Sequence, residues 1–187
     1  TLAEYRSLLE ANTEELEALQ KDVLIGYTKF FRDSLFFEAL TQRVFPLLPL
    51  KFSHDEPIRL WIAGCSTGEE AYSVVISFME YLEEKGLDVK IQIFATDVSP
   101  ASIEKARIGI YSQSIVTDVS PERLERFFTP VPNGYKIKSQ IREVCLFARQ
   151  NILDDPYFSR IDLVICRNVL IYFDLQAQRK ALFRFYQ

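Results

Sequence analysis

The sequence predicts an α/β fold built on a parallel sheet, and two observations support this prediction. Short, nearly continuous apolar runs occur at residues 59–63 (RLWIA), 90–95 (KIQIFA) and 161–166 (IDLVIC). Strands that are covered on both faces, as in parallel sheets, have sequences of this kind. In addition, the first two runs are each followed by a helical pattern, and this alternation of strand and helix is typical of α/β proteins.

The first 50 residues predict a helical segment that precedes the sheet. Apolar residues recur every three or four positions over residues 2–23, where Asn12 and Thr13 offer a cap, and again over residues 28–48. The pattern is then interrupted by three prolines, Pro46, Pro49 and Pro57. We therefore expect a helical segment over residues 1–50, an α/β domain over residues 55–187, and a boundary near residues 49–57.

Two strand–helix units open the α/β domain. The strand at residues 59–63 leads into the glycine-containing loop Gly64–Gly68, and a helix is expected from Glu69 to about Glu84, closed by Gly86. The strand at residues 90–95 ends at Asp97. A second helix then begins after Ser99, with Pro100 at its first position, and is expected to run to about Arg107.

Residues 110–143 depart from this alternation and predict a small antiparallel β insertion. Asn133-Gly134 is a turn dipeptide of β-hairpins, and residues 121–128 fit a short helix. Regular order returns with residues 145–148, which fit a fourth strand, and with the strand at 161–166. A final helix is expected from about Leu175 to the end of the sequence.

Composition narrows the class of protein. The chain has 187 residues, of which 48% are hydrophobic and 26% charged, with a net charge of −4. This acidic balance argues against a nonspecific nucleic-acid binder. No apolar run reaches the roughly 18 residues of a membrane span, and the first residues lack a signal-peptide pattern. We expect a cytoplasmic protein with no nucleic-acid partner and no membrane insertion.

The cysteine and histidine content gives no metal site. Cys65, Cys145 and Cys166 are far apart in the sequence, and His54 is the single histidine. Neither a CxxC pair nor a multi-histidine zinc site can be formed from these residues. We therefore expect no metal, and we interpret the three cysteines as small packing residues.

Polar residues follow each expected strand and predict a ligand site. Ligands of open α/β sheets bind beyond the carboxyl ends of the strands. The residues at those ends are Gly64–Gly68 with Glu69 and Glu70, then Asp97, Asn151 and Asn168. Taken singly, each also fits an ordinary role as a cap, a turn residue or a partner of the helix dipole.

The chemistry of these residues favours a nucleoside that carries a positive charge. The glycine loop has no P-loop lysine and lacks the G-x-G-x-x-G spacing, and Glu69 and Glu70 stand where a phosphate would sit. An acidic residue at a strand end, such as Asp97, commonly accepts hydrogen bonds from ribose hydroxyls. Together these features point to S-adenosyl-L-methionine as the cofactor.

Five motifs in this chain also match a known family. They are Phe30-Phe31-Arg32-Asp33, residues 63–73 (AGCSTGEEAYS), Ala95-Thr96-Asp97, residues 106–111 (ARIGIY) and residues 166–173 (CRNVLIYF). The sequence resembles the chemotaxis-receptor glutamate methyltransferases of the CheR family. Residues 25–33 look like those of members that are fused to other signalling modules.

The resemblance implies a Rossmann-like methyltransferase sheet that binds S-adenosyl-L-methionine and releases S-adenosyl-L-homocysteine. By similarity, Thr28 and Arg32 would reach the methionine end of the cofactor, Glu69 its amino group and Asp97 its adenosine. The rest of the surround would be Gly64, Asn151, Ile152, Asn168 and Val169. Gly26 stands where family members often have asparagine, so a contact to the cofactor is missing there or is made by the backbone.

The implied reaction is O-methylation of glutamate side chains in chemoreceptor-type proteins. Arg32 would orient the incoming carboxylate, although it also fits a solvated helix charge, and Tyr186 would face the acceptor pocket. The insertion at residues 110–143 would match the small β-subdomain that contacts the receptor. Two alternatives stay open: a catalytically silent sensory module that binds the cofactor or a receptor tail, and a methyltransferase of the same fold with another carboxylate substrate.

The same resemblance predicts that the sheet is incomplete at its C-terminal edge. A complete methyltransferase sheet carries further strands after the last strand expected here, and the sequence stops in the following helix. We therefore expect a segment of a larger protein. An edge strand left uncovered in this way favours self-association.

Overall fold

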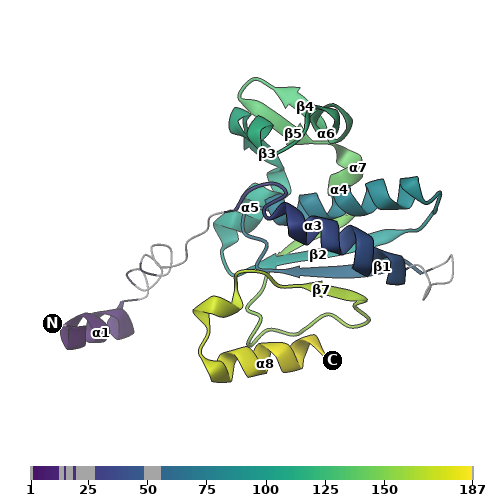
Figure 1. Ribbon diagram of the computed structural model, residues 1–187. Coiled ribbons are helices and arrows are strands. Elements are labelled where there is room, and N and C mark those ends of the chain that lie inside the picture. The colour runs from purple at the N-terminus through teal and green to yellow at the C-terminus, as the bar shows by residue number, and fades with distance from the viewer. Residues whose placement is uncertain (1, 13–14, 16–18, 20–27, 49–55, 187) are drawn as a thin grey trace.

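A four-stranded parallel sheet forms the centre of the computed structural model, which describes residues 2–12, 15, 19, 28–48 and 56–186 (Figure 1). The strands are β1 (Ile58–Ala63), β2 (Ile91–Asp97), β6 (Cys145–Arg149) and β7 (Leu163–Ile165). Their order is β6-β2-β1-β7, and all neighbouring pairs are parallel. The α/β class and the fourth strand are thus confirmed, and β6 and β7 form the two edges of this sheet.

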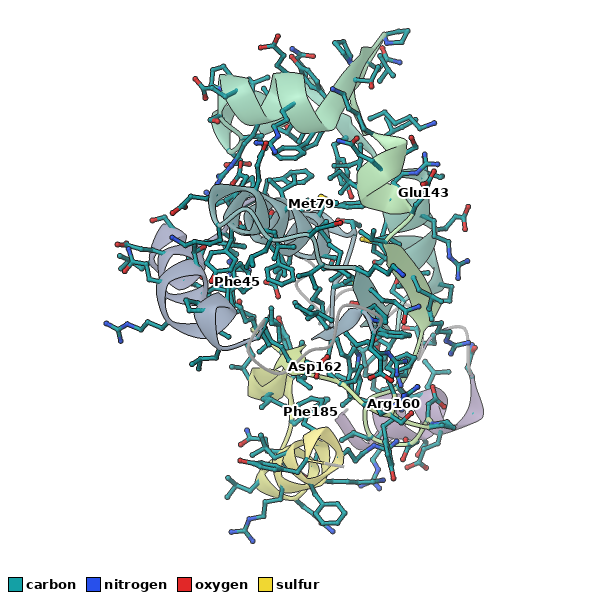
Figure 2. All side chains as sticks on the ribbon, turned by 90° about the vertical axis from the view of Figure 1, so that its right-hand side faces the viewer. Phe45, Met79, Glu143, Arg160, Asp162 and Phe185 are labelled. Carbon is teal, nitrogen blue, oxygen red and sulfur yellow. The ribbon has the colours of Figure 1, made fainter. Side chains whose placement is uncertain are left out.

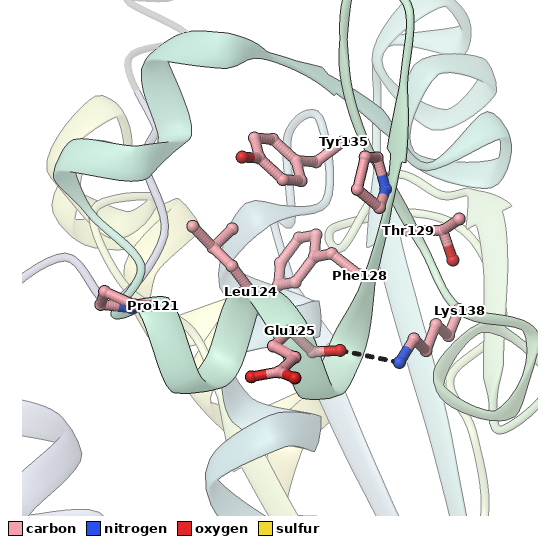
Figure 3. Close-up of a pocket in the computed structure, with 8 residues that line it drawn as sticks. Pro121, Leu124, Glu125, Phe128, Thr129, Tyr135 and Lys138 are labelled. Carbon is pink, nitrogen blue, oxygen red and sulfur yellow. Dashed lines mark hydrogen bonds between the residues drawn. The ribbon is translucent and has the colours of Figure 1, made fainter.

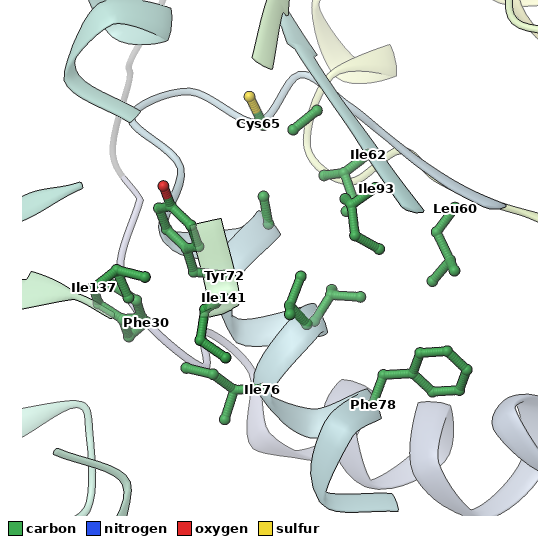
Figure 4. Packing of buried hydrophobic residues seen from close by; sticks show 14 of the residues in the cluster. Phe30, Leu60, Ile62, Cys65, Tyr72, Ile76, Phe78, Ile93, Ile137 and Ile141 are labelled. Atoms are coloured by element: carbon green, nitrogen blue, oxygen red, sulfur yellow. The ribbon is translucent and has the colours of Figure 1, made fainter. Parts of the chain in front are cut away.

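One face of the sheet packs against α4 (Glu69–Glu84), whose bounds agree with the sequence prediction. Successive side chains of a strand point to opposite faces, and Leu60 and Ile62 of β1 are fully buried on the α4 side, as Figure 4 shows. The same face is covered by α3 (Ser34–Ala39), the π-helical turn η1 (Leu40–Val44) and the 3₁₀ turn η2 (Phe45–Leu47). Figure 2 shows Phe45 and Met79 on this side of the sheet.

The opposite face is covered by α8 (Leu175–Phe185), the 3₁₀ turn η5 (Leu170–Tyr172) and the chain that follows β6. Trp61 of β1 is buried here, with its ring 5.4 Å from that of Phe158 and 5.2 Å from that of Phe185. The indole N–H donates to Thr96 Oγ1 at 2.9 Å. Apolar side chains on both faces of β1 and β2 explain why these strands read as continuous apolar runs.

The insertion is a three-stranded antiparallel sheet with the order β3-β5-β4. It follows α5 (Pro100–Ile108), which begins after Ser99 as predicted and is capped by Ser99 Oγ. Its elements are β3 (Ile110–Ser112), the 3₁₀ turn η4 (Gln113–Thr117), α6 (Pro121–Phe127), β4 (Phe128–Val131), β5 (Gly134–Ile137) and α7 (Ser139–Arg142). A Cβ on Gly134 would lie 1.9 Å from Tyr111 O, so the hairpin requires glycine at this position.

In the N-terminal part, the prediction of one continuous helix over residues 28–48 is wrong. The helix expected over residues 28–48 begins only at Ser34, and Phe31 and Asp33 have positive φ values of 49° and 64°. Phe30 is 1% exposed and packs against Tyr111 and Phe128 of the insertion. The Phe31 N–H donates to Ser73 Oγ at 2.9 Å. These long-range contacts hold the chain out of a helix, although its apolar spacing fits one.

The helix expected over residues 2–23 is described over α1 (Leu2–Ala11). Asn12 Oδ1 accepts from the Glu15 N–H at 3.2 Å, which is the contact that a cap at Asn12 would make. Most of the remainder of this expected helix, and most of the expected domain boundary, lie outside the described residues. None of the helices in the described part of the chain is long and apolar enough to cross a membrane.

Candidate functional site at the carboxyl edge of the sheet

The loop Gly64–Gly68 is fixed by backbone hydrogen bonds and by two glycines with positive φ. The N–H groups of Gly64 and Cys65 donate to Thr96 O at 2.7 and 2.9 Å, which ties the loop to the end of β2. Gly64 has φ +79°, and a Cβ there would lie 2.2 Å from Val169 Cγ2. The loop after β1 therefore packs directly on the residue that follows Asn168, as only glycine permits.

Asp97, at the end of β2, holds two loops with one carboxylate. Its Oδ2 accepts from the Ser66 N–H and its Oδ1 from the Ser99 N–H, each at 2.9 Å. A carboxylate has about four acceptor positions. Asp97 thus organises the glycine loop and the start of α5 and keeps acceptor capacity for a ligand.

Glu69 lies in the first turn of α4 and is 8% exposed. Thr67 Oγ1 donates to Glu69 Oε2 at 2.6 Å, and Tyr111 Oη donates to Thr67 O at 2.8 Å. Burial, together with the nearby Glu69, raises the pKa of Tyr111 well above its ordinary value, so the phenol keeps its proton. The positive end of the α4 dipole favours the charge of Glu69.

Four charged residues from three distant segments form a second group at this edge, which we call the charge cluster: Arg32, Asp33, Glu70 and Arg167. Arg167 Nη1 donates to Glu70 Oε2 at 2.9 Å and to Arg32 O at 3.3 Å. Its Nη2 pairs with Asp33. Burial raises the pKa of Glu70, while the charges of Arg167 and Arg32 act in the opposite direction. The positive charge of Arg32 thus interacts with the carboxylate of Glu70, at the start of α4.

The residues after β6 and β7 complete the edge. Asn151 caps its own turn, because its Oδ1 accepts from the Leu153 N–H at 3.0 Å and its Nδ2 donates to Asp154 at 2.9 Å. Ile152 is buried, and Val169 is half-buried against Gly64. Asn168 is exposed and has φ 56°, a left-handed conformation that asparagine adopts more readily than most residues.

The three remaining predicted site residues, Thr28, Gly26 and Tyr186, differ in where they lie. Thr28 is half-buried and begins the non-helical segment that carries Arg32, whereas Gly26 lies outside the described residues. Tyr186 is 92% exposed at the end of α8. Because α8 runs back from the carboxyl edge toward the start of β1 (Figure 1), the structure does not bring Tyr186 to the other candidates, and we leave it out of the proposed site.

The sequence alone assigned no role to Arg167 and Tyr111, which the structure places at this edge. Both belong to motifs quoted above, so membership in those motifs was the available signal. Their partners, Glu70, Asp33 and Thr67, are far away in the chain. Spacing and periodicity do not reveal such contacts.

A separate hollow of about 510 Å³ lies in the insertion, away from the strand ends (Figure 3). Its lining includes Leu124 of α6, Phe128 and Pro130 of β4, and Tyr135 of β5. Lys138 Nζ closes one side by donating to Glu125 O at 2.8 Å. In the described part of the chain, no group of three or more His, Cys, Asp or Glu side chains is arranged for a metal ion.

The fold is that of an α/β domain, and its carboxyl edge carries carboxylates without phosphate-binding features. Comparison with known proteins gives the family. Residues 26–187 match the family described as "CheR methyltransferase, SAM binding domain", and the chain belongs to this family. S-adenosylmethionine is the cofactor for which this domain is named.

Of three similar curated proteins, two are named as methyltransferases. The chain is 43% identical over 98% of its length to an "Uncharacterized 104.1 kDa protein in hypE 3'region" of Rhodobacter capsulatus. It is 32% identical over 91% of its length to a "Chemotaxis protein methyltransferase" of Borreliella burgdorferi and 39% identical over 87% to the "Putative methyltransferase Cher3" of Pseudomonas putida. The chain spans 19%, 63% and 60% of these three relatives.

Among solved structures, the chain aligns with the carbon methyltransferase DszA at 16% identity and a TM-score of 0.49. The alignment covers 81% of this chain and 32% of that one. A likeness at this level does not bear on the activity.

The donor set of the carboxyl edge fits S-adenosylmethionine. The cofactor carries an amino group, a carboxylate, ribose hydroxyls and a positive sulfur, but no phosphate. Glu69 and Asp97 supply two carboxylates at neighbouring strand ends, Arg32 supplies a guanidinium, and the glycine loop has no lysine. The observed contacts of Asp97 leave it able to accept further hydrogen bonds.

Proposed function

We propose that this domain binds S-adenosylmethionine and methylates glutamate side chains of chemoreceptor-type signalling proteins. The observation that carries the proposal is the pair Glu69 and Asp97, which the loop Gly64–Gly68 joins through Thr67 Oγ1 and the Ser66 N–H. Membership in the CheR family and the names of the chemotaxis methyltransferase relatives support the reaction and the substrate class.

The proposal gives the following residues of the edge a part in cofactor binding. Glu69 receives the amino group of the cofactor, and Asp97 accepts from its ribose hydroxyls. Thr28 and Arg32 reach the methionine end. The remaining surround is made by Gly64, Asn151, Ile152, Asn168 and Val169.

The chain needs no general base for this reaction. When bound, S-adenosylmethionine supplies a methyl group on a positively charged sulfur. A glutamate side chain has a reference pKa near 4.3 and is already ionised at neutral pH. The work of the protein is therefore alignment, for which well-oriented groups lower a barrier by roughly 7–11 kcal/mol. Arg32 is the cation that can orient the incoming carboxylate.

The insertion is the part that we propose contacts the substrate protein. It carries an apolar hollow, lined by Leu124, Phe128 and Tyr135, that is separate from the strand ends. Phe128 also packs against Phe30, at a ring distance of 5.4 Å, in the segment that carries Arg32. A protein held on the insertion would therefore lie next to the methyl-transfer site.

Binding of the product S-adenosylhomocysteine, measured by calorimetry, tests the proposal. Asp97→Asn should weaken binding by about tenfold or more, since each tenfold is about 1.4 kcal/mol and a charged acceptor is lost. Asp162→Asn is the matched control, because Asp162 Oδ2 accepts from the Arg59 N–H at 2.9 Å near the start of β1. This control should bind as the unchanged chain does.

No heat of binding to the folded, unchanged chain would overturn the proposal, and equal effects of the two substitutions would overturn the site. Transfer of labelled methyl groups to receptor peptides then separates the enzyme from the silent module. A domain that binds the product but methylates no receptor peptide contradicts the proposed reaction. Labelling of other carboxylates under the same conditions would contradict the substrate class.

A further inference from the structure

Two residues of the segment from Thr28 to Asp33 have an unfavourable backbone conformation. Phe31 and Asp33 have φ values of 49° and 64°. These values lie in the left-handed region, which is uncommon for residues other than glycine. Such conformations persist only where surrounding contacts impose them. Since this segment carries Arg32, the contacts that impose it also decide where Arg32 lies.

Arg167 makes several of those contacts from the end of β7. Its guanidinium donates to Arg32 O at 3.3 Å and pairs with Asp33, so it binds the backbone and a side chain of the segment. The same group donates to Glu70 of α4 at 2.9 Å and lies 4.1 Å from the centre of the Phe36 ring. One planar side chain thus joins β7, α4, the segment and α3.

The segment is also held by α6 and α4. The Arg123 guanidinium lies 4.0 Å from the centre of the Phe31 ring and binds both carboxylate oxygens of Glu80 at 2.9 and 2.7 Å. The Phe31 N–H donates to Ser73 Oγ. These contacts fix Phe31, whereas the contact to the carbonyl of Arg32 comes from Arg167.

We propose that Arg167 is a positioning residue, which holds the backbone of Arg32 at the carboxyl edge before the cofactor binds. This inference rests on the proposed function and assigns it one further residue. The side chains of Arg167 and Glu70 are 15% and 14% exposed, so their ion pair is little screened by water. The fork of the guanidinium is needed, because a lysine ammonium is a point charge that cannot reproduce the same set of contacts.

Arg167→Lys is the central variant, since it keeps a positive charge for Glu70 while losing the fork. Hydrogen exchange of the Phe31 and Phe36 amides is measured in the unliganded chain, together with thermal unfolding and product binding. The Phe36 amide is informative because it donates to Asp33 O at 2.9 Å. We expect both amides to exchange about tenfold faster and binding to weaken about tenfold, which is about 1.4 kcal/mol.

The melting temperature of Arg167→Lys should stay close to that of the unchanged chain, because Glu70 keeps a cationic partner. Arg160→Gln serves as the control: it breaks the exposed pair with Glu56, whose side chains are 76% and 69% exposed. Exposed pairs contribute little to stability. This control should leave exchange, melting and binding unchanged.

Normal exchange in Arg167→Lys overturns the inference, even where binding is weaker, because Arg167 would then act on the ligand directly. If Arg167→Lys does not fold, Asp33→Asn is measured in the same way, since it removes one contact and leaves Glu70 paired. Unchanged exchange in Asp33→Asn counts against the inference and faster exchange supports it. Failure of the unchanged chain to bind product overturns the proposed function, while the exchange data still decide the role of Arg167.

Discussion

The two halves of the carboxyl edge are held together by different forces. The glycine half, residues 64–69 with Asp97, is fixed by its backbone N–H groups, which donate to Thr96 O and to the Asp97 carboxylate, and by glycine conformations. The charge cluster is fixed by side chains that come from three segments. Arg32 and Arg167, which meet there, are 135 positions apart in the chain.

This difference decides how each half responds to change. The glycine half depends on space and backbone geometry, so an added methyl group is its most damaging substitution. The charge cluster depends on a little-exposed ion pair. Removing one partner of such a pair leaves the other charge unpaired. The charge cluster should therefore be most affected by substitutions that remove a charge and by changes in pH. Three predictions test the comparison, beginning with the largest effect.

Gly64→Ala should be the most destabilising of these changes. A left-handed alanine costs about 1–2 kcal/mol, and overpacking costs about 1–3 kcal/mol more, because the new Cβ would meet Val169 Cγ2 at 2.2 Å. Gly86→Ala is the matched control, since Gly86 has φ +63° and nothing within 4 Å of an added Cβ. Chemical denaturation should show the conformational cost alone for Gly86→Ala.

The double variant Gly64→Ala, Val169→Ala separates the two costs at this position. The second substitution removes the atom that the new Cβ would strike, so part of the stability lost in Gly64→Ala should return. Equal losses in Gly64→Ala and Gly86→Ala would show that the contact with Val169 is unimportant. The glycine half would then be held by backbone geometry alone.

Glu70→Gln should change how stability depends on pH, with a smaller effect than Gly64→Ala. Burial raises the pKa of Glu70 above its ordinary value of 4.5. Between the unfolded and folded pKa values the folded state binds more protons, so this contribution to stability is present at lower pH and is lost as pH rises. The unchanged chain should therefore lose stability relative to Glu70→Gln as pH rises through this window.

Melting temperatures of both chains across the acidic range measure this difference. Glu56→Gln, at an exposed position, corrects for the general effect of removing a carboxylate. The opposite trend, a gain of the unchanged chain over Glu70→Gln with rising pH, would mean that Arg167 and Arg32 outweigh burial. The charge cluster would then be stabilising on balance.

Alkylation of two cysteines should give the smallest effect. Cys65 lies in the glycine half, and Cys166 is next to Arg167 in the chain. Burial raises the pKa of Cys166 to about 12 and that of Cys65 further. Because the thiolate is the reactive form, iodoacetamide should modify neither residue quickly in the folded chain near neutral pH. Cys166, half-buried, should react before Cys65, which is 1% exposed.

Mass spectrometry of the alkylated chain shows the order of modification, with the unfolded chain as the reference for full reactivity. Rapid modification of Cys65 in otherwise folded protein would show that the glycine half opens more readily than the charge cluster. That result would contradict the close packing and backbone hydrogen bonds of the glycine half.

The parts of the fold that the sequence predicted are those encoded by neighbouring residues. The bounds of α4 follow from an apolar helical pattern after Gly68, and the start of α5 follows from Ser99 and Pro100. β1 and β2 could be predicted as strands because both of their faces are buried, which gives nearly continuous apolar runs in the sequence. In contrast, residues 28–33 have the spacing of a helix, but contacts of Phe30 and Phe31 with the insertion and α4 override it.

The sequence by itself determined the α/β class, the order of the elements and the polar residues at the strand ends, because these depend on periodicity and on short turns. Only the tertiary structure decided that β1 and β2 lie at the centre of the sheet, which brings Ser66 to Asp97. It also decided that Arg167 meets Glu70 and Asp33, and that Tyr186 lies away from them. The physical reason is that such contacts join residues far apart in the chain, and packing rather than local pattern selects them.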